Sequence, residues 1–445
     1  RAGALTADDR LLHARALFRL GRYDAAAAEF ARVPATHREG GDAAYERARA
    51  VLRAGRLGEA RTLLRAIPND FPKDADAAGR ALYLLADLAT DEGRDEAARS
   101  TFRHLAATYP TSGMAPRARF QAAIIAYADG HYRAAAAEMD TLESRYPRAS
   151  DALAALYWAG RAHARIGDSA SAAARWRQVN EREPLSYYGV LARRRLGLPP
   201  WSPATGSQPR SVFPAVDSAF ARADELALLG LDPELSREHA RLAATADSSP
   251  ARLLATAEGF HARGSSSRGI ALAQRALAAG APRDVRSYRA LYPVVHGDVL
   301  VAESEERKLD PALVAALIRQ ESNFLATARS PAGARGLMQL MPDVGRSVAR
   351  GLDFSTWDVA LLYQPDVNVR LGTTHLATLV RQYDELPHVL AAYNAGGSRV
   401  RRWLQKGGAA SDPELFTERI PYVETRDYVR IVERNREVYR GLYGW

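Results

Sequence analysis

The stretch GRYDAAAAEF, residues 21–30, opens with a glycine, places an aromatic residue two positions later, and continues with Ala26 and Phe30. The alanine and the large apolar residue return at the same offsets from a glycine four more times along the first half of the chain, at Gly55, Gly93, Gly130 and Gly167, whereas the aromatic position is weak in three of these units. Successive glycines are 34, 38, 37 and 37 residues apart. A period of this length is typical of stacked helical hairpins, in which the glycine turns the chain between two helices.

Each repeat therefore predicts two antiparallel helices, and its small alanine lets the second helix approach the first closely. Prolines follow the second helix of each unit, where a helix is expected to stop; they are Pro34, Pro68, Pro110, Pro147 and Pro184. The pattern resembles tetratricopeptide repeats, with a period that drifts above 34. We expect residues 1–200 to form a tetratricopeptide-like α-superhelix, either an open solenoid or ring-like.

The composition of the whole chain favours an all-α protein of several domains. Its 445 residues are 47% hydrophobic, helix formers dominate, and runs of β-branched residues are few and short. The stretch WSPATGSQPRSVFP (201–214) is rich in Ser, Pro and Gly, which is typical of a linker. We expect a linker with further helical hairpins over 201–292 and a separate domain over 293–445.

Composition also excludes several classes of function. The chain has no cysteine, so it carries neither disulfides nor cysteine-ligated metals. No run of about 18 apolar residues predicts a membrane span. The net charge of +9 comes from arginines spread along the chain, without the basic patch or motif that nucleic-acid binding requires. No metal-ligand spacing or nucleotide-binding loop occurs, so we expect no metal and no cofactor.

One helix of the last third carries an acidic residue on its apolar side. ALVAALIRQESNF (312–324) has a stripe that includes Leu317 and Ile318, and Glu321 continues this stripe. Asp310 and Pro311 suit the start of this helix. Burial and the negative end of the helix dipole should both raise the pKa of Glu321, as a general acid requires. Alternatively, Glu321 meets solvent at a frayed helix end or pairs with a neighbouring Arg or Gln.

Four further segments follow this helix in the sequence. SPAGARGLMQLMP (330–342) predicts a tight loop, and DVNVRLGTTHLATLV (366–380) predicts an amphipathic helix in which Gly372 lets another backbone approach. LAAYNAGGSRVRRWL (390–404) places a Tyr-Asn pair at the end of an apolar helix that two glycines terminate. ERIPYVETRDYVRIV (418–432) restarts a helix after its proline.

Residues 298–440 resemble the catalytic domain of lytic transglycosylases, the lysozyme-like enzymes that cleave bacterial peptidoglycan. The matching motifs are Glu321-Ser322, Gly336–Pro342, Ala392–Gly396, and Pro421-Tyr422 with Glu424-Thr425-Arg426. The repeats and YYGVLARRRLG (187–197) are similar to the large soluble members, in which an α-superhelix holds the catalytic domain. The resemblance implies a lysozyme-like, mostly α-helical catalytic domain after the repeats.

The resemblance implies that Glu321 is the single catalytic acid and base. It would protonate the oxygen between N-acetylmuramic acid and N-acetylglucosamine, and then deprotonate the muramoyl 6-hydroxyl, which leaves a 1,6-anhydro end. Ordinary glycoside hydrolysis uses two carboxylates. An internal hydroxyl makes the second carboxylate unnecessary, and among these motifs Glu321 has the setting that suits acid chemistry.

The other site residues carry over by position. Ser330 and Gln339 would bind polar groups of the substrate, Met341 would pack against a sugar, Tyr393 would lie near Glu321, and Glu424 would be a second, non-nucleophilic acid. The supporting residues are Ser322, Asn368, Asn394 and Tyr422. Four of these residues also have a plain structural interpretation: Met341 as a core methionine, Asn368 and Asn394 as asparagines that bond helix ends, and Glu424 as a glutamate that favours the first helical turn.

The expected substrate is the glycan strand of peptidoglycan in the periplasm of a bacterium, with no nucleic-acid partner. An export signal is not visible in this chain, which begins at Arg1. Two alternatives stay open: a hydrolase of the goose-lysozyme type, and a repeat scaffold that binds partner proteins while its lysozyme-like domain is inactive. The sequence does not distinguish attack at chain ends from attack within the glycan.

Overall fold

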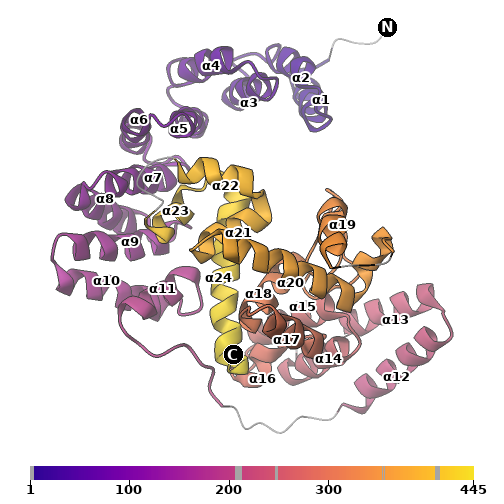
Figure 1. Ribbon diagram of the computed structural model, residues 1–445. Helices are drawn as coiled ribbons and strands as arrows, with labels where there is room; N and C mark the ends of the chain where they lie inside the picture. The colour runs from indigo at the N-terminus through magenta and orange to yellow at the C-terminus, as the bar shows by residue number, and fades with distance from the viewer. Residues whose placement is uncertain (1–4, 206–212, 246–248, 353, 355, 406–410) are drawn as a thin grey trace. The chain divides into compact units, whose positions relative to one another are not determined.

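The computed structural model describes residues 5–205, 213–245, 249–352, 354, 356–405 and 411–445. These residues form 24 α-helices, one 3-10 helix and no β-strand (Figure 1). The predicted all-α class is therefore confirmed. The chain divides into two compact units, residues 1–182 and 183–445. The predicted boundaries at residues 200 and 292 stay predictions, and the middle of the predicted linker, 206–212, lies outside the described residues.

The first unit contains ten helices that pack in sequence order as antiparallel hairpins. They are α1 (Ala7–Arg19), α2 (Tyr23–Phe30), α3 (Gly40–Arg53), α4 (Leu57–Asp70), α5 (Ala75–Asp91), α6 (Asp95–Thr108), α7 (Ala115–Ala128), α8 (Tyr132–Arg145), α9 (Ala152–Arg165) and α10 (Ser169–Arg182). All five repeat glycines lie at the turn within a hairpin with φ between +74° and +84°. This left-handed conformation costs glycine little, which explains why the repeat is punctuated by it.

The alanine of each repeat is buried where its two helices meet. Its exposed fraction is at most 1% in all five repeats, at Ala26, Ala60, Ala98, Ala135 and Ala172. The prolines end the second helices as expected, with one exception. Pro68 lies inside α4, which continues to Asp70 because the amide of Phe71 still bonds the carbonyl of Ile67 at 2.8 Å. The proline loses its own N–H bond, but the bonds of the residues after it can still form, so the last turn survives here.

The second unit contains the remaining helices. They are α11 (Tyr187–Arg195), α12 (Pro214–Leu228), α13 (Asp232–Thr245), α14 (Pro250–Ala262), α15 (Ser266–Ala278), α16 (Val285–Leu291), α17 (Gly297–Glu306), α18 (Pro311–Glu321), α19 (Pro342–Gly351), the 3-10 helix η1 (Val359–Tyr363), α20 (Pro365–Gln382), α21 (Leu386–Ala395), α22 (Gly397–Leu404), α23 (Pro413–Arg419) and α24 (Val423–Tyr443). Within the described ranges, no helix is both long and apolar enough to cross a lipid bilayer.

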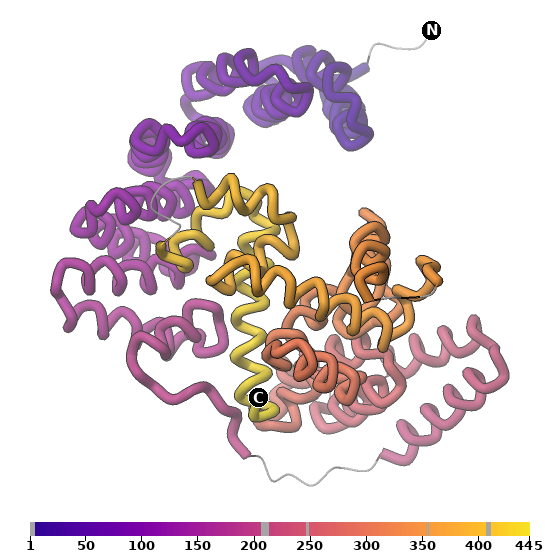
Figure 2. Tube along the Cα trace, in the orientation of Figure 1, coloured from indigo at the N-terminus to yellow at the C-terminus, as the bar shows by residue number. Residues whose placement is uncertain are grey.

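Helix α18 lies at the centre of the core of this unit. Its residues 312–318 are each at most 5% exposed, and it packs against the long helix α24, which runs beside it in Figure 2. Asp310 fixes the start of α18: one carboxylate oxygen accepts the amide of Ala312 at 3.0 Å, as the sequence predicts. Its other oxygen meets Arg436 at 2.5 Å and Arg440 at 2.9 Å, both on α24. The two helices are thereby held in register.

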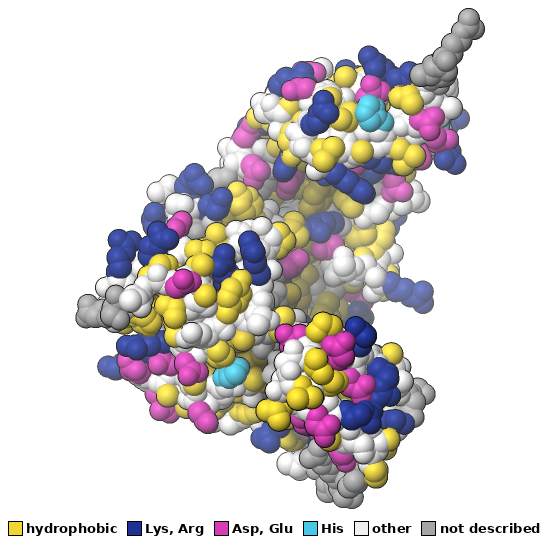
Figure 3. All heavy atoms as spheres, turned by 90° about the vertical axis from the view of Figure 1, so that its right-hand side faces the viewer, with side chains coloured by type: hydrophobic (Ala, Val, Ile, Leu, Met, Phe, Trp, Pro, Cys, Tyr) yellow, Lys and Arg dark blue, Asp and Glu magenta, His cyan; other side chains and the backbone are white. Residues whose placement is uncertain are grey.

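The surface carries charges of both signs. On the face shown in Figure 3, basic and acidic side chains are interspersed and no extended field of one sign is visible. This distribution agrees with the spread of arginines along the sequence, and it gives no support to a nucleic-acid interface on that face.

Gly372 of α20 is required by a side chain rather than by the backbone that its sequence context suggested. A Cβ atom at this position would lie 2.2 Å from Sδ and 2.9 Å from Cβ of Met338. Gly372→Ala should therefore lower the free energy of unfolding by about 1–3 kcal/mol, the usual cost of overpacking a core. Gly351→Ala is the matched control, because a Cβ atom there would meet no described atom within 4 Å. Equal denaturation midpoints for the two variants would contradict this account.

Candidate active site

Glu321 is the last residue of α18, where the apolar stripe of that helix ends. The next residue, Ser322, is 8% exposed and donates its hydroxyl to the carbonyls of Ile318 at 3.2 Å and Leu337 at 2.8 Å. Ser322 therefore ties the end of the helix to the Gly336–Pro342 loop. This contact brings together the first two sequence motifs of the predicted site.

A tight turn follows Glu321. The amide of Leu325 bonds the carbonyl of Ser322 at 3.0 Å, and the two central residues have positive φ, 52° for Asn323 and 60° for Phe324. Left-handed backbone costs a non-glycine residue roughly 1–2 kcal/mol. Phe324 offsets this cost by burying its ring, which is 1% exposed, and Arg319 bonds the side chain of Asn323. The turn is thus held by its surroundings rather than by local preference.

The loop over residues 328–341 is folded back on itself. Arg335 forms backbone bridges with Arg329 and Leu340. Asn368, at the start of α20 and fully buried, donates to the carbonyls of Arg335 at 3.1 Å and Leu362 at 2.8 Å and accepts the amide of Met338 at 2.8 Å. Asn368 therefore anchors the loop from inside the protein, which is a supporting position.

Helix α21 contributes its Tyr-Asn pair at the same place. Tyr393 donates its hydroxyl to the carbonyl of Met338 at 2.7 Å. Asn394 accepts the hydroxyl of Thr425 from α24 at 2.7 Å. Burial and the charge of Glu321 both raise the pKa of Tyr393, which places this ring near the carboxylate. The structure thus brings together Glu321, the loop, and the ends of α21 and α24.

The pKa of Glu321 is raised from 4.5 to about 7. Burial is the largest cause, since a carboxylate loses hydration in an apolar setting. Tyr428 of α24 acts in the opposite direction, because its hydroxyl donates to Oε1 of Glu321 at 2.7 Å and stabilises the anion. The negative charge of Glu424 raises the pKa further. Glu321 therefore holds a proton at much higher pH than an exposed glutamate does.

Met341 and its neighbours in the loop differ in exposure. Met338 and Leu340 are at most 2% exposed and belong to the core, whereas Met341 is 43% exposed. Met341 is therefore available to a ligand, and its plain interpretation as a core residue is wrong. Ser330 and Gln339 already serve the loop: Oγ of Ser330 accepts the amide of Ala334 at 3.0 Å, and Nε2 of Gln339 donates to the carbonyl of Gly336 at 2.9 Å.

The start of α24 presents two exposed residues of the predicted site. Glu424 lies exposed in the first helical turn. Tyr422 is 49% exposed and packs edge-on against Trp403 of α22, with ring centroids 5.4 Å apart. The guanidinium of Arg399 lies 5.7 Å from the centre of the Tyr422 ring. An aromatic surface next to a carboxylate suits a polyhydroxylated ligand with apolar faces.

Sequence reasoning missed Tyr428, which makes the direct hydrogen bond to Glu321. A signal was present in the spacing, because Tyr428 follows Glu424 by four residues and therefore lies on the same face of the helix. That spacing does not identify which residue of another helix the hydroxyl meets. The partner, Glu321, is 107 positions away along the chain.

Glu321, an acidic side chain of raised pKa, next to motifs that expose Met341 and Tyr422, has the arrangement expected of an acid–base active site. Comparison with known proteins shows which families the chain resembles. Residues 298–416 match the family described as Transglycosylase SLT domain. Residues 17–80 match the tetratricopeptide repeat family, and residues 75–188 match a family described as outer membrane lipoprotein.

Relatives and solved structures agree with these matches. The chain is 32% identical over 155 residues to a soluble lytic murein transglycosylase of Salmonella typhimurium. That match covers 34% of this chain and 24% of the relative, so it spans about a quarter of the relative's length. The resemblance drawn from the motifs is thus confirmed: residues 298–416 match the transglycosylase SLT domain family, and residues 17–80 match the tetratricopeptide repeat family.

Two crystal structures share the fold. An inactive variant of the lytic transglycosylase Slt of Pseudomonas aeruginosa superposes with a TM-score of 0.71 at 24% identity, covering 98% of this chain and 73% of that one. The 70 kDa soluble lytic transglycosylase of Escherichia coli gives a TM-score of 0.61 at 20% identity, covering 99% and 82%. At these identities the likeness establishes the architecture.

Two substitutions should move the pKa of Glu321 in opposite directions. Tyr428→Phe removes the hydrogen bond that stabilises the anion and should raise the pKa above about 7. Glu424→Gln removes a neighbouring negative charge and should lower it. Carbon-detected NMR titration of carboxyl-labelled glutamate in the full chain measures both shifts. Shifts of the same sign in the two variants would refute the described surroundings of Glu321.

Proposed function

We propose that this chain is a lytic transglycosylase, which cleaves the β-1,4 bond between N-acetylmuramic acid and N-acetylglucosamine in peptidoglycan and leaves 1,6-anhydro ends. The observation that carries the proposal is the carboxyl group of Glu321, which keeps its proton near neutrality. It lies within a segment that matches the transglycosylase SLT domain. A general acid works best when its pKa lies close to the operating pH.

The reaction needs one carboxyl group used twice. The protonated Glu321 gives its proton to the glycosidic oxygen while the bond from that oxygen to the anomeric carbon breaks. The resulting carboxylate accepts the proton of the muramoyl 6-hydroxyl while that oxygen bonds to the same carbon. Glu321 ends the cycle protonated again, and no water enters. Attack within one sugar profits from a high effective concentration.

Glu424 fits a supporting role better than a nucleophilic one. It is exposed, and its charge enters the site by raising the pKa of Glu321. Nucleophilic and general-base carboxylates of glycosidases act from the face of the sugar opposite the acid. In the proposed reaction the internal 6-hydroxyl, which gives its proton to Glu321, makes such a carboxylate unnecessary. A muramidase of the goose-lysozyme type would use water instead and release reducing ends.

The remaining roles extend the same proposal. Tyr428 tunes Glu321, and Tyr393 closes the site next to it. Met341 and Tyr422, both exposed, would contact sugar rings. Ser330 and Gln339 would bind polar substituents of the sugars with the hydrogen-bonding capacity of their side chains that the loop does not already use. The proposal includes action in the bacterial periplasm and a catalytic domain over residues 293–445 that follows a repeat region over 1–200.

Product analysis tests the reaction itself. Wild-type protein incubated with purified sacculi should release muropeptides with anhydro-muramoyl ends, identified by mass spectrometry. Glu321→Gln should lower turnover by at least about 100-fold, since general acid–base catalysis contributes about 10²–10⁴-fold. Reducing ends would show a hydrolase, and no turnover by the wild type would favour the scaffold.

The pH profile should follow the proton on Glu321. Because the acid must begin protonated, activity should fall as the pH rises through about 7. In Tyr428→Phe this alkaline limb should lie at higher pH, and in Glu424→Gln at lower pH. Turnover on sacculi measured from pH 5 to 9 gives the three curves. A profile that stays flat to pH 9 in the wild type would remove Glu321 from the role of acid.

Burying the Glu321 carboxyl group also lowers the stability of the protein at high pH. A carboxyl group whose pKa is raised from 4.5 to about 7 on folding contributes stability that is fully present below pH 4.5 and lost as the pH rises through 7. Glu321→Gln escapes this loss, so the variant should be more stable than the wild type at pH 8.5 by up to about 3 kcal/mol. The difference should shrink towards pH 5. Urea denaturation at both pH values measures it and also shows that the inactive variant is folded.

A further inference from the structure

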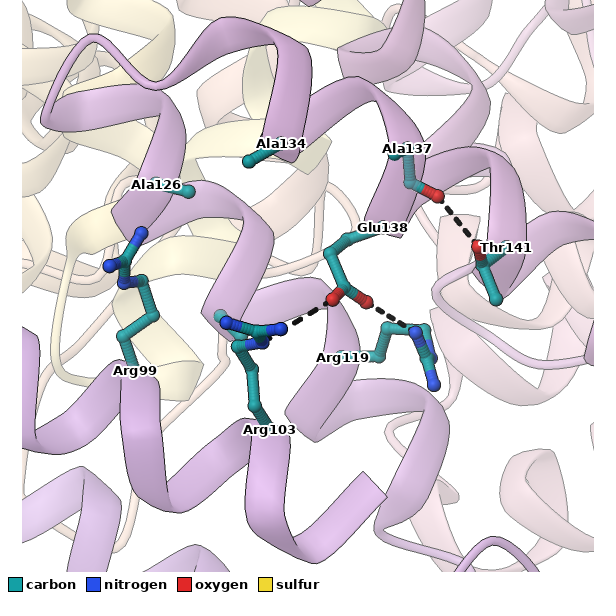
Figure 4. Close-up of a pocket in the computed structure, with 9 residues that line it drawn as sticks. Arg99, Arg103, Arg119, Ala126, Ala134, Ala137, Glu138 and Thr141 are labelled. Carbon is teal, nitrogen blue, oxygen red and sulfur yellow. Dashed lines mark hydrogen bonds and ion pairs between the residues drawn. The ribbon is translucent and has the colours of Figure 1, made fainter. Parts of the chain in front are cut away.

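The repeat unit contains a hollow that the proposed reaction does not use. Figure 4 shows it between α6, α7 and α8, with a volume of about 280 Å³. A second hollow of about 510 Å³ adjoins it along α6 and shares four lining residues, Arg99, Arg103, Arg119 and Glu138. We refer to the two together as the arginine pocket.

Basic groups outnumber acidic ones in the arginine pocket. Glu138 accepts both Arg103, at 3.5 Å, and Arg119, so that one carboxylate serves two guanidinium groups. Arg99 lies one helical turn before Arg103 and pairs with Glu96 at 2.9 Å. The Glu96 side chain is 74% exposed, so solvent screens that pair strongly. Two like charges four residues apart on a helix repel each other. An anion entering the pocket would relieve this repulsion.

The next repeat lacks this excess. Thirty-seven residues later, the period of the array, Glu138 corresponds to Arg175 and Arg103 corresponds to Asp140. There Arg175 meets Asp140 at 2.8 Å, and His163 approaches the other oxygen of the same carboxylate at 3.2 Å. Charges are balanced at that place. The excess of Arg99, Arg103 and Arg119 over Glu138 and the exposed Glu96 is therefore a feature of this pocket and not of the repeat.

The pocket is also prepared for a ligand. The Arg119 side chain is only 12% exposed and is fixed by Glu138, while its Nε lies buried without a hydrogen-bond acceptor among the described residues. The Arg103 side chain is 62% exposed at the mouth. A guanidinium group matches a carboxylate with two parallel hydrogen bonds. One held and one accessible guanidinium can therefore receive a carboxylate with little loss of side-chain freedom.

The apolar part of the lining limits what accompanies the carboxylate. It consists of alanine side chains from α7 and α8: Ala122, Ala126, Ala134 and Ala137. Methyl groups on the wall leave room for short alkyl groups of a ligand and offer no hydrogen bonds to sugar hydroxyls. The chemistry suits a peptide of small and acidic residues.

We propose that the arginine pocket binds a short acidic peptide through its carboxylates, with small side chains such as alanine against the alanine wall. The identity of this peptide rests on the proposed function, because the peptide stems of peptidoglycan, which would supply the ligand, combine alanine with acidic residues. Glycan strands that carry intact stems would then have a second point of attachment, on residues other than those of the catalytic site.

Calorimetric titration of the full-length Glu321→Gln variant with the tripeptide L-alanyl-γ-D-glutamyl-diaminopimelate tests the proposal without turnover. The tripeptide should bind, and its fully amidated form and inorganic phosphate should bind at least about tenfold more weakly. Arg103→Gln and Arg99→Gln should each weaken binding about tenfold, the value of one charge-assisted hydrogen bond. Arg133→Gln, an exposed arginine of α8 outside the pocket, is the matched control.

The outcomes separate this inference from the proposed function. Undetectable tripeptide binding, or binding that Arg103→Gln and Arg99→Gln leave unchanged, would overturn the pocket even where the wild type releases anhydro ends. Equal affinity for phosphate would show a general anion site and overturn the peptide assignment. Equal affinity for the amidated form would exclude the carboxylates. Unfolding curves of both arginine variants should match that of Arg133→Gln, which shows that any loss of binding is local.

Discussion

The candidate site of the second unit is built around one carboxyl group, that of Glu321, which is largely withdrawn from water. Burial raises its pKa, and the residues of α18 that precede it, 312–318, lie buried in the apolar core. Asp310 joins the opposite end of α18 to α24 through Arg436 and Arg440, so the helix that delivers Glu321 and the helix that delivers Tyr428 cannot shift independently. The loop, held by Asn368, and Tyr393 complete the enclosure. Together these contacts limit the access of water to the carboxyl group of Glu321.

A raised pKa alone does not mark a catalytic residue. Glu433, also on α24, has its pKa raised to about 7 by burial, against the opposing influence of Arg194 and Arg436. Its Oε2 is buried and has no hydrogen-bond partner within the described residues. What distinguishes Glu321 is a hydroxyl that holds one of its oxygens and a surface with exposed Met341 and Tyr422 in the adjoining motifs. A raised pKa therefore indicates a catalytic candidate only together with neighbouring groups that a substrate could contact.

The sequence predicts those features that depend on local chemistry. Glycines at a fixed period mark the turns, since a left-handed φ is cheap only for them, and the Asp310 cap and the apolar face of α18 follow from neighbouring residues. Contacts between distant residues escape such reasoning. Tyr428 and Glu321 meet because two helices cross, and the three hydrogen bonds of Asn368 join segments that no periodicity relates. The prediction that α4 ends at Pro68 was wrong because the helix continues to Asp70, where the amide of Phe71 still bonds the carbonyl of Ile67.

The unfavourable conformations of the site lie next to its chemistry, and the core compensates for them. Phe324 and Gln339 both hold positive φ, one just after Glu321 and the other inside the loop, and each is retained by contacts that extend beyond the turn itself. A glycine at either position would relax the backbone but would lose the buried ring or the side-chain amide that holds the loop. The sequence therefore keeps strained residues where their side chains fix the geometry. It uses glycine where only the turn matters, as in the repeats. The loop itself uses both solutions, because Gly333 and Gly336 also have positive φ there, next to Gln339.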